Sequence, residues 1–167
     1  LKKKKPKLIT SLNEDVLAHR ELGKVEELWY KSSFDGRDIQ GWIVKPPFYD
    51  ATKKYPLLVE NHGGPILNYG DRFTAEIQLY AAEGYVVFYP NPRGSTSYGE
   101  EFGNLLKNNY PGQDYNDVMD GVDYLVDKGI ADNDKLFVTG GSAGGIMTAW
   151  IIGKNNRFKA AVVVKPV

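Results

Sequence analysis

The sequence predicts an α/β fold, built on a mostly parallel sheet that begins with an antiparallel hairpin. From residue 55 onward, strand-like apolar runs alternate with helical stretches, which implies parallel strands joined by right-handed crossovers. Two further strand-like runs, separated by turn residues, precede this alternation. No segment repeats at the period of a solenoid, so a repeat architecture is excluded.

The hairpin is expected between residues 25 and 45. The runs 25–34 and 39–45 have the composition of strands, and Asp35-Gly36-Arg37-Asp38 supplies the turn between them. Two prolines at 46 and 47 end the second strand, because proline cannot donate a hydrogen bond to a sheet.

The remaining elements are expected in strict alternation, with a loop rich in Gly, Ser and Asn from 90 to about 113. The helix at 114–128 is the most strongly amphipathic, and Gly129 ends it. The run at 85–89 is apolar throughout, as expected for a strand covered on both faces. The expected strands are 55–60, 85–89, 136–138 and 160–164, and the expected helices are 73–83, 114–128 and 143–152.

The first 24 residues lack a comparable pattern. We expect a short strand at 7–10 and a polar connector or a short helix at 13–22. The four lysines at 2–5 are not followed by an apolar stretch, so we do not expect them to belong to a signal peptide. They are interpreted as a solvated strand end or turn rather than a localisation or anion-binding signal.

The composition is that of a globular protein of about one domain, with 167 residues, 42% of them hydrophobic and 13% aromatic. Lys plus Arg equals Asp plus Glu at 21 each, so no net charge favours nucleic acid as a partner. No apolar run approaches the roughly 18 residues of a membrane span. The absence of cysteine excludes disulfides and thiolate metal sites, and leaves a cytoplasmic, periplasmic or secreted location undecided.

The most informative segment is Gly140-Gly141-Ser142-Ala143-Gly144-Gly145, a Gly-x-Ser-x-Gly pattern between an expected strand and an expected helix. Such a turn is too tight for side chains beside the serine, and it exposes the serine oxygen as a nucleophile. The N–H of Ala143 would then be one donor to the oxyanion. A phosphate-binding glycine turn and a packing turn are the alternatives, and the strand-to-helix context favours the nucleophile.

A second loop supports this interpretation. The expected strand at 55–60 runs into His62-Gly63-Gly64-Pro65, and in α/β-hydrolases the loop after the third strand supplies the other oxyanion N–H. We assign that donor to Gly64. His62 is interpreted as shaping this loop through a hydrogen bond rather than as the general base, and His19 as a surface residue.

The order of the catalytic triad along the chain shows which of its residues this sequence lacks. In α/β-hydrolases the triad runs serine, then acid, then histidine. Residues 143–167 contain no Asp, Glu or His, so neither the acid nor the base can follow Ser142 within this chain. Without a base, a serine hydroxyl is a weak nucleophile near neutral pH.

Five segments, in the order expected, resemble the prolyl oligopeptidase family (S9) of serine peptidases. They correspond to its first hairpin, its oxyanion loop in the acylaminoacyl-peptidase and dipeptidyl-peptidase-like branches, the loop after the next strand, the following helix and the doubled-glycine nucleophile turn. The segments are 33–37 with 40–42, 62–65, 91–102, 117–125 and 140–145.

The resemblance implies an α/β-hydrolase fold cut short before its last strands. Residues 25–167 would be the N-terminal portion of the catalytic domain, and residues 1–24 a linker with the last strand of a preceding β-propeller. The acid and base would lie in the absent C-terminal part of the same domain. That part, the propeller and a peptide substrate are therefore the implied partners, and no metal or organic cofactor is implied.

Three residues depart from the family pattern. Ala143 replaces a frequent aromatic residue, which would change the acyl pocket but not the donor N–H, and Ser97 replaces a usual glycine. Lys165 stands where small residues are common, so it is a candidate for substrate contact, although a solvated lysine is favoured. Arg93 and Tyr98 also have two interpretations: contact with substrate, or, as we favour, pairing of Arg93 with an aspartate of the next helix and packing of Tyr98 within its loop.

The sequence as a whole predicts a serine peptidase acting on short peptides through an acyl-enzyme on Ser142, with the 167 residues inactive alone. A carboxylesterase or lipase of the same fold is the alternative enzyme. A non-catalytic assembly unit is the alternative from another class, because an incomplete sheet exposes an edge strand that favours self-association.

Overall fold

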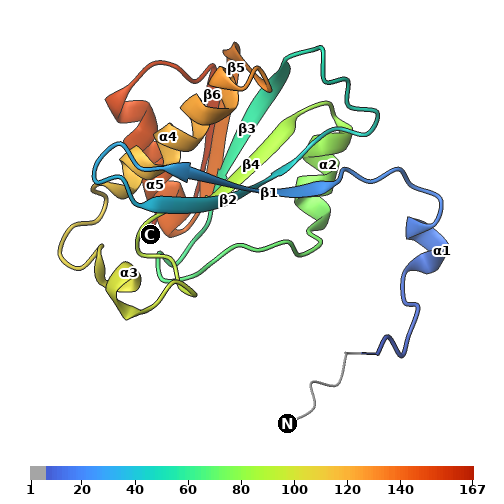
Figure 1. Ribbon diagram of the computed structural model, residues 1–167, viewed down its shortest axis with the longest axis horizontal. Coiled ribbons are helices and arrows are strands. Elements are labelled where there is room, and N and C mark those ends of the chain that lie inside the picture. Colours follow the sequence, from blue (N-terminus) through green and yellow to red (C-terminus); the bar gives the residue numbers. More distant parts are fainter. Residues whose placement is uncertain (1–6) are drawn as a thin grey trace.

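The computed structural model describes residues 7–167 as six strands and five helices (Figure 1). The lysines at 2–5 lie outside the described residues. The strands are β1 (Val25–Lys31), β2 (Asp38–Val44), β3 (Tyr55–Asn61), β4 (Val86–Asn91), β5 (Ala131–Gly141) and β6 (Ala160–Val164). The helices are α1 (Glu14–Leu17), α2 (Ala75–Ala82), α3 (Glu100–Asn104), α4 (Asp114–Asp127) and α5 (Ala143–Lys154).

The strands form one mixed sheet in the order β1-β2-β4-β3-β5-β6. The first hairpin, β1 with β2, is antiparallel and joins β4 antiparallel, whereas the pairs of β3 with β4, β3 with β5 and β5 with β6 are all parallel. The predicted α/β class, a mostly parallel sheet with an antiparallel hairpin at its start, is therefore confirmed.

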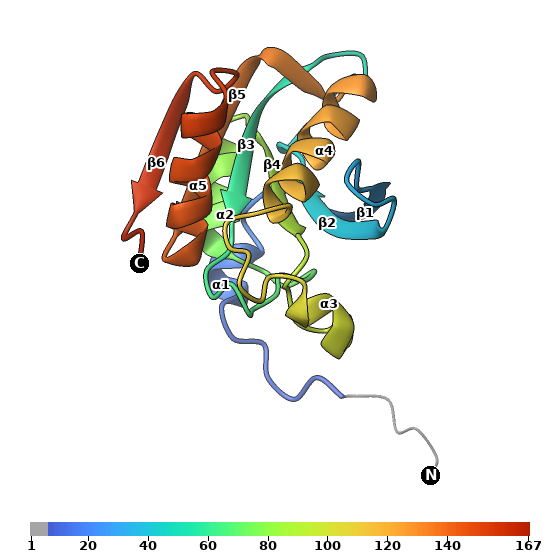
Figure 2. The same ribbon diagram turned by 90° about the vertical axis from the view of Figure 1, so that its left-hand side faces the viewer.

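Helices cover the sheet from both sides (Figure 2). One core lies between the sheet and α4 and α5, and a smaller core lies between β2, β4 and α2. All six residues of β4 are buried, which explains why every residue before the final Asn91 is apolar or aromatic. On α4 the predicted apolar face is buried, and Gly121 allows close approach, since a Cβ there would lie 2.3 Å from the Phe88 ring.

Three expectations about local structure need correction. Residues 7–10 form no strand and are exposed, because no neighbouring strand lies beside them to pair with. Strand β5 begins at Ala131 rather than at 136, and a polar run, 132–135, exposed from 133 onward, interrupts its apolar pattern. This run coincides with a register shift, because Tyr55 pairs with Ala131 but Leu57 pairs with Leu136. Helix α3 lies within the segment expected to be loop.

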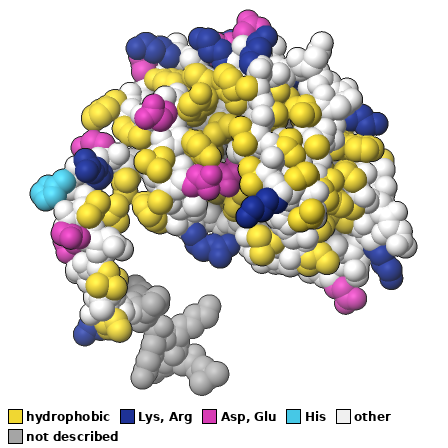
Figure 3. Space-filling view, turned by 180° about the vertical axis from the view of Figure 1, so that it is seen from behind, with side chains coloured by type: hydrophobic (Ala, Val, Ile, Leu, Met, Phe, Trp, Pro, Cys, Tyr) yellow, Lys and Arg dark blue, Asp and Glu magenta, His cyan; other side chains and the backbone are white. Residues whose placement is uncertain are grey.

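One face of the sheet remains open beside α2. Strand β6 forms the edge of the sheet, and most of its residues are exposed, including Val162 at 60%. Between α2 and the β5–β6 face lies a groove of about 510 Å³ lined mostly by apolar and aromatic residues, with Glu76 and Thr139 among them. Seen from behind, this side of the molecule carries many hydrophobic side chains (Figure 3).

Candidate active site

Ser142 lies at the junction of β5 and α5, as predicted, with an unusual backbone conformation. Its φ of 57° and ψ of −124° turn the chain abruptly from strand to helix, and the residue is exposed. Its N–H donates to the carbonyl oxygen of Val164 at 3.0 Å, which ties the turn to β6. Its hydroxyl donates to the carbonyl oxygen of Val167 at 3.1 Å.

Three glycines around Ser142 are required by close backbone contacts. A Cβ on Gly140 would lie 2.4 Å from the carbonyl oxygen of Gly144, and a Cβ on Gly144 would lie 2.0 Å from the carbonyl oxygen of Asn61. A Cβ on Gly145 would lie 2.6 Å from the carbonyl oxygen of Val164. By contrast, a Cβ on Gly141 would meet nothing within 4 Å, so packing does not demand glycine there.

The start of α5 presents free N–H groups beside Ser142. Ala143 is the first residue of the helix and is 2% exposed. The first N–H groups of a helix have no acceptor within it, and the helix dipole makes that end favourable for negative charge. The N–H of Ala143 therefore has no acceptor within α5 and lies at the end of the helix that favours negative charge.

The second glycine loop lies directly against this turn. A Cβ on Gly63 would lie 3.4 Å from the Cβ of Ser142 and 4.0 Å from its Oγ, so the absence of a side chain lets the loop approach the serine. Gly64 has a φ of 116°, and a Cβ there would lie 2.7 Å from the backbone nitrogen of Ile66. The parallel pairing of β3 with β5 brings together these loops, which lie about 80 residues apart.

His62 points into the loop that follows it rather than toward Ser142. Its Nδ1 lies 2.8 Å from the carbonyl oxygen of Gly63 and must donate there, and its Nε2 lies 2.9 Å from Oγ of Ser95. Burial lowers the pKa of His62, an effect that the bond to Gly63 partly opposes, so the neutral ring is favoured. Among the described residues, no His, Asp or Glu side chain is hydrogen-bonded to Ser142.

Arg93 makes the structural pairing that we favoured. Its Nε and Nη2 donate to the two carboxylate oxygens of Asp117 in α4, each at 2.8 Å. It also donates to Ser32 and to Asp35 in the turn between β1 and β2, and its guanidinium lies over the ring of Phe34. Arg93 therefore ties the loop after β4 to both the first hairpin and α4.

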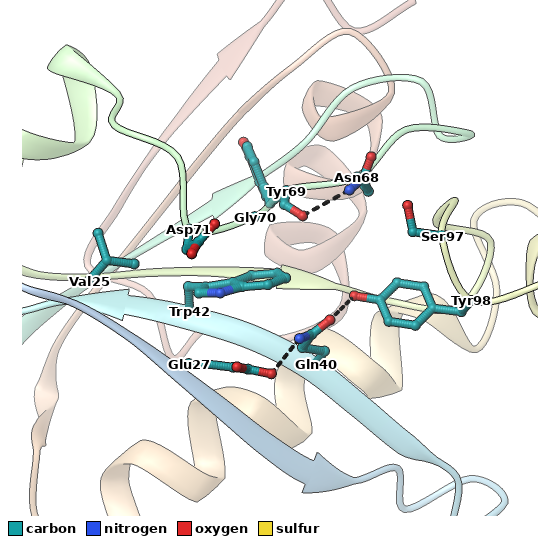
Figure 4. Close-up of a pocket in the computed structure, with 10 residues that line it drawn as sticks. All are labelled: Val25, Glu27, Gln40, Trp42, Asn68, Tyr69, Gly70, Asp71, Ser97 and Tyr98. Atoms are coloured by element: carbon teal, nitrogen blue, oxygen red, sulfur yellow. Dashed lines mark hydrogen bonds between the residues drawn. The ribbon is translucent and has the colours of Figure 1, made fainter. Parts of the chain in front are cut away.

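Tyr98 lines a cavity of about 460 Å³ between β1, β2 and the two loops that follow β3 and β4 (Figure 4). Its hydroxyl accepts a hydrogen bond from Asn91 at 2.7 Å and donates to Gln40, which in turn donates to Glu27. The Trp42 ring lies in the same cavity. Tyr98 thus holds its loop against the hairpin while one side of its ring remains in the cavity.

Lys165 follows β6 at the same end of the sheet as Ser142. It is exposed and has a positive φ of 43°. The side chain thus remains in solvent at the rim of the turn that carries the serine.

Sequence reasoning missed one contact to the turn at Ser142. Tyr110, in the irregular segment before α4, donates a hydrogen bond to the carbonyl oxygen of Ala143. No periodicity or motif could have indicated it, because a single tyrosine in a loop carries no spacing signal. Across residues 7–167, three or more His, Cys, Asp or Glu side chains nowhere gather closely enough to hold a metal ion. Within that same range, no helix has the length and apolar character of a membrane span.

Comparisons with known proteins identify the family of this chain. The model of the prolyl oligopeptidase family matches residues 71–167. The chain is 42% identical over 162 residues to the uncharacterized peptidase YuxL of Bacillus subtilis, covering 96% of this chain and 24% of that protein. It is 36% identical over 163 residues to dipeptidyl-peptidase 5 of Schizosaccharomyces pombe, covering 92% of this chain and 24% of that protein.

A solved structure shows the same arrangement of elements. The acylaminoacyl peptidase of Pyrococcus horikoshii superimposes with a TM-score of 0.85 at 31% identity, covering 93% of this chain and 25% of that one. The chain thus spans about a quarter of the length of the relatives that it matches. Since the family model matches more than half of the chain and the fold agrees, this chain belongs to the prolyl oligopeptidase family.

Proposed function

We propose that this chain carries the nucleophile and the oxyanion hole of a serine peptidase that cleaves short peptides. One observation carries the proposal: Ser142 is exposed in a strained strand-to-helix turn, and the Gly63 loop lies against it. An exposed serine between two sources of free backbone N–H groups has the arrangement that acyl transfer requires. The names of two relatives, dipeptidyl-peptidase 5 and acylaminoacyl peptidase, agree with peptides as the substrate class.

In the proposed mechanism Oγ of Ser142 attacks the scissile carbonyl carbon. The carbonyl oxygen gains negative charge, which the N–H groups of Gly64 and Ala143 stabilise, and collapse of this intermediate expels the amine and leaves an acyl-enzyme. Water then hydrolyses the ester. The proton of Ser142 must pass to a base, and His62 cannot serve, because Nδ1 donates to Gly63 and Nε2 is directed to Ser95.

The base and its acid partner are therefore proposed to lie in the remainder of the catalytic domain, outside these 167 residues. The 167 residues alone would then be inactive, with the serine positioned but its hydroxyl not activated. We further propose that residues before 25 connect to a β-propeller, as the family resemblance implies.

The intact mass of the 167-residue chain after incubation with a fluorophosphonate tests the missing base, with Ser142→Ala as the control. We expect no adduct on either protein. An adduct that the control lacks would mean that a base is present after all, and the account of His62 would be wrong. In the full-length protein we expect an adduct that Ser142→Ala abolishes, and an adduct on that variant would refute Ser142 as the nucleophile.

Hydrolysis of a peptide anilide and of a short-chain ester by the full-length protein separates a peptidase from a carboxylesterase. The proposal expects a higher kcat/KM for the anilide whose peptide part fits the site. Efficient cleavage of esters of many acyl lengths, with no cleavage of peptide anilides, would instead identify an esterase.

A further inference from the structure

Tyr110 connects the irregular segment before α4 to the start of α5. Its hydroxyl donates a hydrogen bond of 2.5 Å to the carbonyl oxygen of Ala143, the residue after the candidate nucleophile. Among the described residues, it is the only side chain from outside α5 that bonds to the backbone of 140–145. The contact therefore links a loop, by one side chain, to the turn on which the proposed chemistry depends.

The surroundings of Tyr110 keep its hydroxyl in place as a donor. Its ring is half-buried and packs against the core beneath α4 and α5. Burial, and secondarily the nearby carboxylate of Asp114, raise the pKa of Tyr110 to about 12, so the hydroxyl keeps its proton at any working pH. The backbone of the segment is itself fixed, because the N–H of Gly112 donates to Asp114 at 2.6 Å.

The turn at Ser142 needs such external restraint. A backbone conformation like that of Ser142, with φ 57° and ψ −124°, is unfavourable and persists only where its surroundings impose it. One restraint comes from β6, through the bond from the Ser142 N–H to the carbonyl of Val164. The hydroxyl of Tyr110 supplies a second restraint from a different part of the chain.

The carbonyl that Tyr110 holds is coupled to the proposed oxyanion donor. The N–H and the carbonyl of Ala143 are attached through one Cα, and helical φ and ψ fix the angle between them. A bond that fixes the direction of the carbonyl therefore also fixes the direction of the N–H. An oxyanion donor acts only when it is aimed within about 2.7–3.1 Å of the developing charge.

We propose that Tyr110 is a positioning residue for the oxyanion hole, acting through the carbonyl of Ala143 on the N–H of the same residue. This inference rests on the proposed function of Ser142. Tyr110 does not contact substrate in this role, so its hydroxyl affects stabilisation of the transition state and leaves ground-state binding unchanged.

The test is Tyr110→Phe in the full-length protein, with Tyr115→Phe as the matched control. The control also removes a hydroxyl with one hydrogen bond, from Asn155 at 3.1 Å at the other end of α5. The measurements are kcat and KM for a peptide anilide and Ki for a peptide aldehyde of the same sequence. All rates are normalised to the fraction of serine that a fluorophosphonate titrates to completion, so unfolded protein is not counted.

We expect kcat of Tyr110→Phe to fall about 10- to 100-fold, less than the 10²–10³-fold that follows removal of an oxyanion donor. KM should stay within about threefold, and aldehyde affinity should fall in proportion to kcat/KM, because the aldehyde adduct uses the same donors. Tyr115→Phe should match the unmodified protein in kcat, in KM and in the Ki of the aldehyde.

Three results would overturn the inference: an unchanged kcat for Tyr110→Phe, an equal loss in Tyr115→Phe, or a raised KM with constant kcat. Ser142→Ala keeps this test separate from that of the proposed function. Activity retained by Ser142→Ala refutes the proposed function itself, whereas an essential Ser142 with a normal Tyr110→Phe refutes only the role of Tyr110.

Discussion

The guanidinium of Arg93 is bonded bidentately to the carboxylate of Asp117, and both side chains are almost completely buried. The same carboxylate accepts the backbone N–H of Arg93 at 2.8 Å. Because these groups have little access to water, each depends on the other for its hydrogen bonds. The pair connects the loop after β4 to α4, and the loop in turn supplies Ser95 to His62.

Replacement of Asp117 by Asn should destabilise the protein strongly. The variant leaves the Arg93 cation buried with only Asp35 as a charged partner, and removal of one member of a buried pair costs about 3–5 kcal/mol. Urea unfolding of the purified protein measures this loss. Asp123→Asn, which breaks the more exposed pair with Arg157, is the control and should cost less than about 1 kcal/mol. Equal losses in both variants would contradict the role given to burial.

The glycines around Ser142 should differ sharply in their tolerance of alanine. Gly144→Ala places a Cβ 2.0 Å from the carbonyl oxygen of Asn61, so the turn must shift, at a cost of about 1–3 kcal/mol. Displacement of Ser142, the proposed nucleophile, by about 1 Å is expected to lower kcat/KM of the full-length protein about 100-fold. Gly141→Ala, with open space around the new Cβ, should retain activity within about threefold. Similar activities for the two variants would refute the steric account.

The carboxyl of Asp114 should make stability depend on pH between about 4 and 6. Burial raises its pKa from 3.8 to about 6, even though Gly112 and Tyr115 donate to it. The folded state then binds more protons than the unfolded state in this window, so the free energy of unfolding falls as pH rises through it. The expected loss is about 3 kcal/mol, complete above about pH 6.

Asp114→Asn removes this titration while keeping an oxygen that accepts from Gly112. Urea unfolding at pH 4.5 and at pH 7.5 is the measurement. The variant should gain stability relative to the unmodified protein at pH 7.5 but little at pH 4.5. The exposed Asp127→Asn on the same helix should not show this difference. A parallel pH dependence in all three proteins would contradict the prediction.

The 167-residue chain should self-associate through the open edge at β6. Val162 is 60% exposed on an edge strand beside an apolar groove, and such edges pair with other chains. Val162→Lys should therefore shift the light-scattering mass at tens of micromolar toward the monomer. Phe48→Lys, which removes an 87% exposed ring after β2, should leave the association intact. A clean monomer of the unmodified chain would refute the prediction.

Sequence alone predicted the succession of the strands along the chain and the strand-to-helix turn at Ser142, because both depend on local pattern. The apolar run of β4 and the alternation that follows it fix the class of fold, and the Gly-x-Ser-x-Gly spacing fixes the turn at Ser142. The early start of β5 at Ala131 escaped prediction, because the exposed run after it has no strand periodicity. Tyr110 escaped because its contact depends on tertiary packing of a loop.

The order of the sheet also has a consequence for folding during synthesis. Strand β3 lies between β4 and β5 in the sheet. Its edge toward β4 can pair early, whereas its edge toward β5 stays unpaired until the ribosome has added about 70 more residues. Until β5 and the turn at Ser142 have been synthesised, the Gly63 loop cannot make its contact with that turn. A nascent chain thus leaves an apolar strand edge unpaired for several seconds at elongation rates of about 5–20 residues per second, an interval in which a chaperone has access to that edge.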